Sequence, residues 1–152
     1  MNKVNSYKNR IFLLTGFMAS GKSFIGRKVA DGLNCDFIDL DEQIEVQESS
    51  SIAEIFEEKG EEYFRILETK IFSNIISSRE TLCIIAAGGG FPLKEENQKK
   101  MKKVSVIFLD TDLDSILSRL SREEKGKRPL IATLDREEIK KLYKERYKVY
   151  IN

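Results

Sequence analysis

The chain has 152 residues, 41% of them hydrophobic, and its 26 Lys and Arg residues nearly balance its 25 Asp and Glu residues. This length suits one domain with a hydrophobic core, and the near-zero net charge argues against a nucleic-acid-binding protein. The sequence contains no histidine, which excludes His-based triads and histidine metal sites. No apolar stretch approaches the roughly 20 residues that span a membrane, and the amino terminus lacks the apolar core of a signal peptide. We therefore expect one cytoplasmic domain over residues 1–152.

The first element in chain order is an apolar run, Ile11–Thr15, which predicts a buried strand. The pattern GxxxxGKS follows directly, from Gly16 to Ser23, and a helical pattern begins at Lys22. A strand, a glycine loop and a helix in this order are typical of a P-loop that binds nucleotide phosphates. The glycines let backbone N–H groups converge on a polyphosphate, Lys22 reaches its terminal phosphates, and the Ser23 hydroxyl can bind magnesium. A plain glycine-rich turn is the alternative, but the helical period continues through Ile25, Val29 and Leu33.

The rest of the chain alternates between strand-like and helical patterns. Three further apolar runs predict buried strands, at residues 37–38, 82–85 and 104–109. Helical patterns lie between them, at residues 42–48, in a short helix from the capping box Ser51–Glu54 to Gly60, and in a longer helix after it. Asp112 can cap one more helix after the fourth strand. Such alternation predicts a parallel sheet with helices on both faces and a ligand site at the carboxyl ends of its strands.

Two carboxylates, Asp39 and Asp41, follow the second predicted strand. Period-two geometry sends both to the same side, next to the predicted P-loop. A metal-bound triphosphate needs oxygen ligands for magnesium and a carboxylate to orient the attacking group, and these residues could divide the two roles. A polar strand end that caps the next helix is the alternative. Asp110 and Asp112 form a rival pair, which we rank lower because Asp112 is well placed as a helix cap.

Three successive glycines, Gly88, Gly89 and Gly90, end the third predicted strand. Glycine removes the side chain where a backbone must pass close to something, which favours a ligand here, although a flexible turn is the alternative. On the long helix, Arg65 lies three residues before Glu68, so the two side chains can meet. An exposed ion pair of this kind would contribute little stability.

Three further arginines are candidate site residues, one on the last predicted helix and two in the loop before it. In the last predicted helix, Arg146 lies on one stripe with Ile139, Tyr143 and Tyr150, so its guanidinium either extends to water or meets an anion in a cleft. The segment 121–129 is charged and lacks periodicity, which suggests a mobile loop that begins near Arg122 and ends at Arg128. A loop arginine that closes onto a transferring phosphoryl group is one interpretation, and a solvated basic loop is the other.

In this order, the motifs resemble those of shikimate kinases, small P-loop kinases that phosphorylate the 3-hydroxyl of shikimate on the way to chorismate and the aromatic amino acids. The match covers nearly the whole chain and runs through the P-loop, Asp39–Asp41, Phe64–Arg65 with Glu68, Gly88–Gly90, Arg128–Ile131, and Arg146 with Tyr150. The resemblance implies an α/β fold of the P-loop NTPase type, with three layers and a mobile lid over about 121–131. It also implies ATP and Mg²⁺ as cofactors, and a monomer that binds shikimate.

The resemblance further implies site residues. It assigns Lys22, Asp41 and Arg128 to catalysis, with Asp41 as the base and Arg128 as the lid arginine. Mg²⁺ would be held by Ser23 and Asp39. ATP would contact Gly16, Met18, Ala19, Ser20, Gly21, Lys22, Ser23, Phe24, Arg122 and Arg128. Shikimate would contact Asp41, Arg65, Gly88, Gly89, Gly90 and Arg146, with Glu68 positioning Arg65.

Three departures from the family pattern stand out. Ala19 replaces a P-loop glycine, which fits at an ordinary negative φ and strains the loop otherwise. Ala87 replaces a Ser or Thr and removes a hydroxyl near the water shell of the metal. The chain also stops at Asn152, where family members continue into a fifth strand and a terminal helix that help to hold adenine.

Two other functions use the same motifs. A kinase for another small polyol acid, such as gluconate, would combine the P-loop with a different set of arginines. A nucleotide-dependent switch without transfer activity is a more distant alternative. The sequence lacks the NKxD motif of guanine-specific switches, and it has a carboxylate and two arginines suited to an acceptor.

Overall fold

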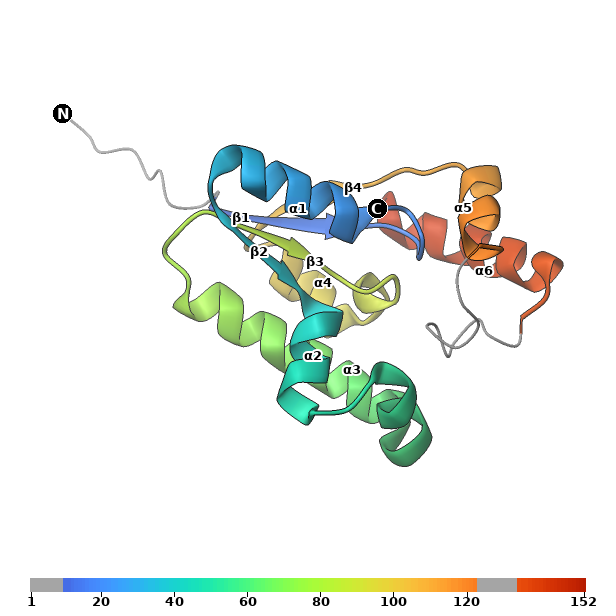
Figure 1. Ribbon diagram of the computed structural model, residues 1–152, viewed down its shortest axis with the longest axis horizontal. Helices are drawn as coiled ribbons and strands as arrows, with labels where there is room; N and C mark the ends of the chain where they lie inside the picture. Colours follow the sequence, from blue (N-terminus) through green and yellow to red (C-terminus); the bar gives the residue numbers. More distant parts are fainter. Residues whose placement is uncertain (1–9, 123–133) are drawn as a thin grey trace.

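Four parallel strands form the sheet of this protein. The computed structural model describes residues 10–122 and 134–152, and Figure 1 shows the arrangement of their elements. The strands lie in the order β2-β3-β1-β4, which places β1 inside the sheet, next to both β3 and β4. Their bounds are β1 (Ile11–Thr15), β2 (Asp36–Asp39), β3 (Cys83–Ala86) and β4 (Ser105–Phe108). All four predicted strands are confirmed, with ends that shift by at most one residue.

Helices cover both faces of the sheet (Figure 1), which confirms the predicted layered α/β fold. One face carries α1, and the other carries α2, α3 and α4, while α5 and α6 lie beyond the carboxyl ends of β1 and β4. None of these helices is long and apolar enough to cross a bilayer, as far as the described residues extend. Their bounds are α1 (Lys22–Leu33), α2 (Leu40–Glu48), α3 (Ile52–Ser78), η1 (Phe91–Leu93), α4 (Glu95–Met101), α5 (Leu113–Leu120) and α6 (Arg136–Tyr150).

The α1 helix packs through its small residues. Gly26 and Ala30 are buried, and a Cβ on Gly26 would lie 2.4 Å from the Phe37 ring, so only glycine lets the helix approach the sheet this closely. The apolar positions that predicted this helix, Ile25, Val29 and Leu33, are 38%, 43% and 56% exposed. The helix is therefore where the sequence predicts it, but its packed face is the one with the smaller side chains.

Local capping signals define α3. The Ser51 hydroxyl and the Glu54 carboxylate form the predicted capping box, and Gly60 has φ 81° and ψ 167°, which breaks the helical path where the short helix was expected to end. Beyond Gly60, Phe64 and Leu67 point into the main core between the helices and the sheet. This packing fixes the neighbouring polar residues Arg65 and Glu68 of the same helix near the end of β3.

The strand register brings the candidate site residues to one level. Ala86 of β3 pairs with both Leu14 of β1 and Asp39 of β2. Two residues beyond these partners come Gly88, Gly16 and Asp41. The glycine loop, the P-loop and the second carboxylate therefore leave the sheet side by side at its carboxyl edge, where parallel sheets bind ligands.

Candidate active site

The P-loop wraps back on itself between β1 and α1. Gly16 and Gly21 have positive φ values of 145° and 97°, and a Cβ on Gly16 would lie 2.9 Å from the carbonyl oxygen of Leu109. Ser20 is almost fully buried, and its N–H donates to the Phe17 carbonyl at 3.2 Å. Met18 is also buried, and its side chain packs with Phe17 against α5 and α6. Both glycines are thus required by backbone geometry, as expected for this motif.

Ala19 has a φ of 58°, which places a non-glycine residue in the left-handed region. The close approach of Cβ to the following carbonyl costs roughly 1–2 kcal/mol in this conformation. The sequence left two possibilities for Ala19, an ordinary negative φ or a strained loop, and the structure has the strained one. Its carbonyl accepts a hydrogen bond from Nη1 of Arg119 at 2.8 Å, which helps to hold this conformation.

Lys22 is 8% exposed and its Nζ lies inside the loop. The ammonium donates to the carbonyls of Gly16 at 2.9 Å and Phe17 at 2.8 Å, and to the Ser20 hydroxyl at 3.3 Å. These contacts hold the ammonium inside the loop, at the position where a polyphosphate would approach.

The two predicted magnesium ligands lie together. The Ser23 hydroxyl donates to Oδ2 of Asp39 at 2.5 Å, and Oδ1 of the same carboxylate caps α2 by accepting from the Asp41 N–H at 3.0 Å. The interpretation of Asp39 as a helix cap is confirmed, and its role as a magnesium ligand stays a prediction. The pair fits Mg²⁺, a hard cation that takes one or two protein oxygens and completes its shell with phosphate and water. Within the described part of the chain no cluster of three Asp, Glu or Cys residues could hold a metal alone.

Asp41 and Glu68 face the glycine loop from two different helices. A Cβ on Gly88 would lie 2.7 Å from Oε1 of Glu68 and 3.2 Å from Oδ1 of Asp41, so two carboxyl groups converge on this glycine. Glu68 is fully buried. Burial, opposed by Arg65 and reinforced by Asp41, raises the pKa of Glu68 to about 7. Glycine at position 88 is the only residue type that leaves this space open.

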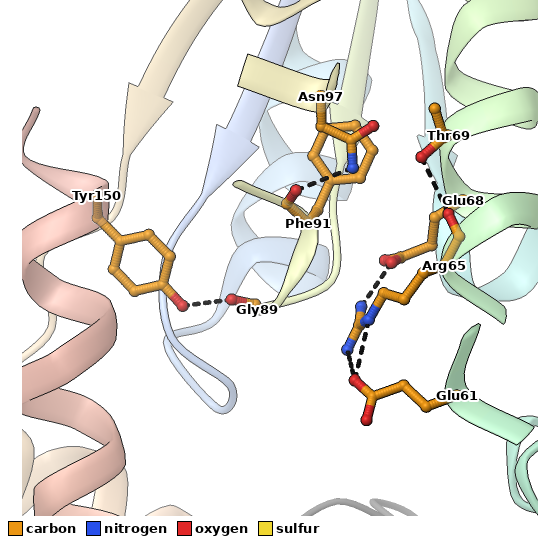
Figure 2. Close-up of polar contacts among 8 residues, drawn as sticks. All are labelled: Glu61, Arg65, Glu68, Thr69, Gly89, Phe91, Asn97 and Tyr150. Carbon is orange, nitrogen blue, oxygen red and sulfur yellow. Dashed lines mark hydrogen bonds and ion pairs between the residues drawn. The ribbon is translucent and has the colours of Figure 1, made fainter. Parts of the chain in front are cut away.

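Arg65 is held by carboxylates on both sides, as Figure 2 shows. Nη1 contacts Oε2 of Glu68 at 2.5 Å, and Nη2 and Nε contact Oε1 of Glu61 at 3.1 and 3.2 Å. A Cβ on Gly90 would lie 2.6 Å from Nη2 of Arg65, so the guanidinium covers this glycine directly. The predicted pair with Glu68 is confirmed, but it is buried rather than exposed.

Arg146 is 7% exposed and lies across the glycine loop from Arg65. Neither its Nε nor its Nη1 has a hydrogen-bond partner. Nη1 would lie 3.6 Å from a Cβ on Gly89, and the guanidinium lies 5.8 Å from the centre of the Phe17 ring. Burial lowers the pKa of Arg146 below its usual value. Of the two sequence interpretations, the structure excludes a side chain extended to water, and an unsatisfied buried cation of this kind calls for an anion.

A cavity of about 1250 Å³ joins the P-loop to the glycine loop. It is lined by the predicted residues Met18, Ala19, Ser20, Gly21, Lys22, Ser23, Phe24, Asp39, Asp41, Gly88, Gly89 and Arg122, together with Arg119. Gly16, Gly90, Arg65 and Arg146 are not in this lining. The lid arginine Arg128 lies outside the described residues, as does most of the predicted lid over 121–131.

Arg119 is a site residue that the sequence did not reveal. It lies on the exposed surface of α5, and only the fold brings its guanidinium to the Ala19 carbonyl and to the cavity. A helix surface with several charges gives no signal that one of them contacts a loop 100 residues away. The rival carboxylates have structural roles, since Asp112 caps α5 and Asp110 accepts a hydrogen bond from the Tyr147 hydroxyl.

Comparisons with known proteins identify the family and the fold of the chain. The family model described as shikimate kinase matches residues 18–152. A shikimate kinase of Persephonella marina is 40% identical over 142 residues, which cover 93% of this chain and 84% of that protein. The solved shikimate kinase from Acinetobacter baumannii in complex with shikimate has a TM-score of 0.86 at 30% identity, over 95% of this chain and 80% of that one. A gluconokinase from Sinorhizobium meliloti 1021 shares the fold at a TM-score of 0.53 and 16% identity, over 94% of this chain and 75% of that one. The chain therefore belongs to the shikimate kinase family.

Proposed function

We propose that this protein transfers the γ-phosphoryl group of ATP to the 3-hydroxyl of shikimate, which yields shikimate 3-phosphate and ADP for aromatic amino-acid biosynthesis. One observation supports this acceptor most directly. Two guanidinium groups, from Arg65 and Arg146, lie against the adjacent glycines 90 and 89. Two arginines, one buried and one partly buried, without side chains between them form a site for a small carboxylate. Asp41 and the P-loop lie beside the same glycine loop.

The donor half of the site uses charge and position. Lys22 would leave the loop carbonyls that it now contacts and neutralise the terminal phosphates of ATP. Mg²⁺ would be held by Ser23 and Asp39, and when bound it neutralises charge on the phosphate oxygens. Arg128 would add a further positive charge on the phosphates, and Arg122 would contact the adenine side. The role of Arg128 rests on the family resemblance alone, and the other roles are also supported by the positions of Lys22, Ser23, Asp39 and Arg122 around the cavity.

The acceptor half uses Asp41 to direct the hydroxyl. In the proposed step, the hydroxyl oxygen forms a bond to the γ-phosphorus, the bond from that phosphorus to the β–γ bridging oxygen breaks, and Asp41 accepts the hydroxyl proton. Asp41 is half-buried and lines the cavity near Ser23 and Gly88. Most of the acceleration would come from alignment and charge, because phosphoryl transfer requires no covalent protein intermediate.

The experiment that tests this function is a coupled ADP-release assay of the full chain with three acceptors. We expect turnover with shikimate, little turnover with gluconate, and only background ATP hydrolysis without an acceptor. A preference for gluconate would favour a kinase for another polyol acid. ATP hydrolysis that no small acceptor changes would favour a nucleotide-dependent switch. A monomeric state, a cytoplasmic location and a single domain over 1–152 stay predictions.

A further inference from the structure

The last turn of α6 is tied to the glycine loop by one side chain. The Tyr150 hydroxyl donates to the carbonyl oxygen of Gly89 at 2.5 Å, and Figure 2 shows this bond reaching from α6 to the loop. Burial raises the pKa of Tyr150 to about 12, so the hydroxyl keeps its proton at neutral pH and remains a donor. Residues 89 and 150 are 61 positions apart in the sequence, so this bond holds α6 against the glycine loop.

This hydrogen bond fixes the orientation of the Gly89–Gly90 peptide, which has no side chains of its own that could pack against a neighbour. The Gly89–Gly90 peptide joins two glycines, which adopt many backbone conformations at little cost. The peptides in the described chain are trans, so a Gly89 carbonyl that points to Tyr150 directs the Gly90 N–H the opposite way. Gly90 lies directly under the Arg65 guanidinium. The phenol thus orients the part of the loop that separates the two arginines.

The same phenol lies against Arg146. Tyr150 and Arg146 are one helical turn apart on α6, so the two side chains lie on the same face of the helix. The positive charge of Arg146 opposes the burial that raises the pKa of Tyr150. The Nε and Nη1 atoms of Arg146 have no hydrogen-bond partner, so no bond from these two atoms fixes the position of the guanidinium. The Tyr150 hydroxyl therefore bonds to the loop, and its side chain shares a helix face with the guanidinium that flanks the proposed carboxylate position.

We propose that Tyr150 is a positioning residue for the acceptor carboxylate, because its hydroxyl orients the Gly89–Gly90 peptide and the Arg146 guanidinium together. This inference rests on the proposed function, since it names shikimate as the acceptor. The ring of Tyr150 has a separate packing role. It lies 5.3 Å from the ring of Phe108 between centroids, and a Phe at position 150 would keep that contact.

The test is Tyr150→Phe in the full chain, which removes the hydroxyl alone. Losing one hydrogen bond that orients a charged group corresponds to about a tenfold rise in the KM for shikimate, while the KM for ATP should change by less than about twofold. Tyr147→Phe is the matched control. It removes a hydroxyl from the same helix, where the ring also packs on Phe108 and the hydroxyl bonds exposed Asp110. Both KM values of this control should match those of the unmodified chain.

Each other outcome has a definite meaning. An unchanged KM for shikimate in Tyr150→Phe, or an equal rise in both KM values, would overturn the positioning role. The second result would mean that the hydroxyl supports the whole loop, which packs so closely on the P-loop that a Cβ on Gly89 would lie 3.2 Å from the Met18 nitrogen. Thermal denaturation of both variants checks that they fold. Absence of shikimate turnover in the unmodified chain would instead overturn the proposed function, and the inference with it.

Discussion

The carbonyl of Ala19 and the guanidinium of Arg119 are joined by a hydrogen bond of 2.8 Å, at the one P-loop position where a non-glycine residue has positive φ. The bond runs from the surface of α5 to a backbone that is strained at φ 58°. A glycine at position 19 would adopt this backbone conformation without strain. With alanine there, the hydrogen bond from Arg119 helps to maintain the conformation. The expected P-loop conformation is retained at a cost in stability.

We expect Ala19→Gly to raise the free energy of unfolding by about 0.5–1 kcal/mol. The substitution relieves roughly 1–2 kcal/mol of left-handed strain, and the greater freedom of glycine in the unfolded chain offsets about half of it. Urea denaturation of both proteins measures the difference.

Ala53→Gly is the control for this prediction, because Ala53 is an exposed residue in the first turn of α3. The same change in a helix should lower the free energy of unfolding by about 0.5–1 kcal/mol. Destabilisation by both substitutions would mean that Ala19 carries no strain.

Local signals explain most of what the sequence predicts correctly. The capping box of Ser51 and Glu54, the break at Gly60 and the cap at Asp112 each depend on residues within a few positions, and all three are present. Arg146 could be singled out because a cation on an apolar helix stripe is anomalous. Such an anomaly is visible in the sequence whatever the fold.

Tertiary contacts explain what the sequence missed. The buried face of α1 is set by the close approach of Gly26 to Phe37, and a stripe of larger apolar residues at the same period suggests the wrong face. The role of Arg119 depends on a bond to a loop carbonyl across 100 positions. The φ of Ala19 depends on how the whole loop closes. None of these follows from periodicity or composition.

Asp41→Asn should reduce turnover by about two orders of magnitude or more and leave ATP binding nearly unchanged. The substitution removes the carboxylate that orients the acceptor hydroxyl, whereas the backbone N–H of residue 41 still donates to Asp39 and keeps the start of α2. Steady-state kinetics and ATP titration separate the two effects. Asp36→Asn, at the exposed opposite end of β2, should leave both unchanged. Near-normal turnover of Asp41→Asn would remove Asp41 from the catalytic step.

Arg146→Met should weaken shikimate binding by roughly 2–5 kcal/mol, the range for losing one partner of a buried charge pair. The same change should raise the free energy of unfolding by about 1 kcal/mol, because it replaces a buried cation that has two unsatisfied nitrogen atoms with an apolar side chain of similar length. Titration calorimetry and urea denaturation measure the two quantities. Arg136→Met, on the exposed start of α6, should change neither. A loss of stability together with unchanged binding would assign Arg146 a structural role.

The last prediction concerns Glu68 and the pH dependence of stability. Its pKa is about 7 in the folded protein and near 4.5 in the unfolded chain, mainly because burial disfavours the charged carboxylate. The folded state therefore binds more protons than the unfolded state between these values, and stability falls as pH rises from about 4.5 to about 7. The full loss corresponds to about 3 kcal/mol. Because the sequence has no histidine, no imidazole titrates in the same window.

Glu68→Gln isolates this effect, because the amide is neutral at every pH. We expect the variant to match the unmodified protein near pH 4, to lose the slope between about pH 4.5 and pH 7, and to exceed its stability by about 3 kcal/mol at pH 8. Shikimate binding should weaken, because a neutral amide holds Arg65 less firmly than the carboxylate that now contacts it at 2.5 Å. Glu61→Gln is the control, since Glu61 contacts the same arginine from the exposed side. Equal slopes for Glu68→Gln and the unmodified protein in urea denaturation across this range would show that the buried carboxyl does not titrate there.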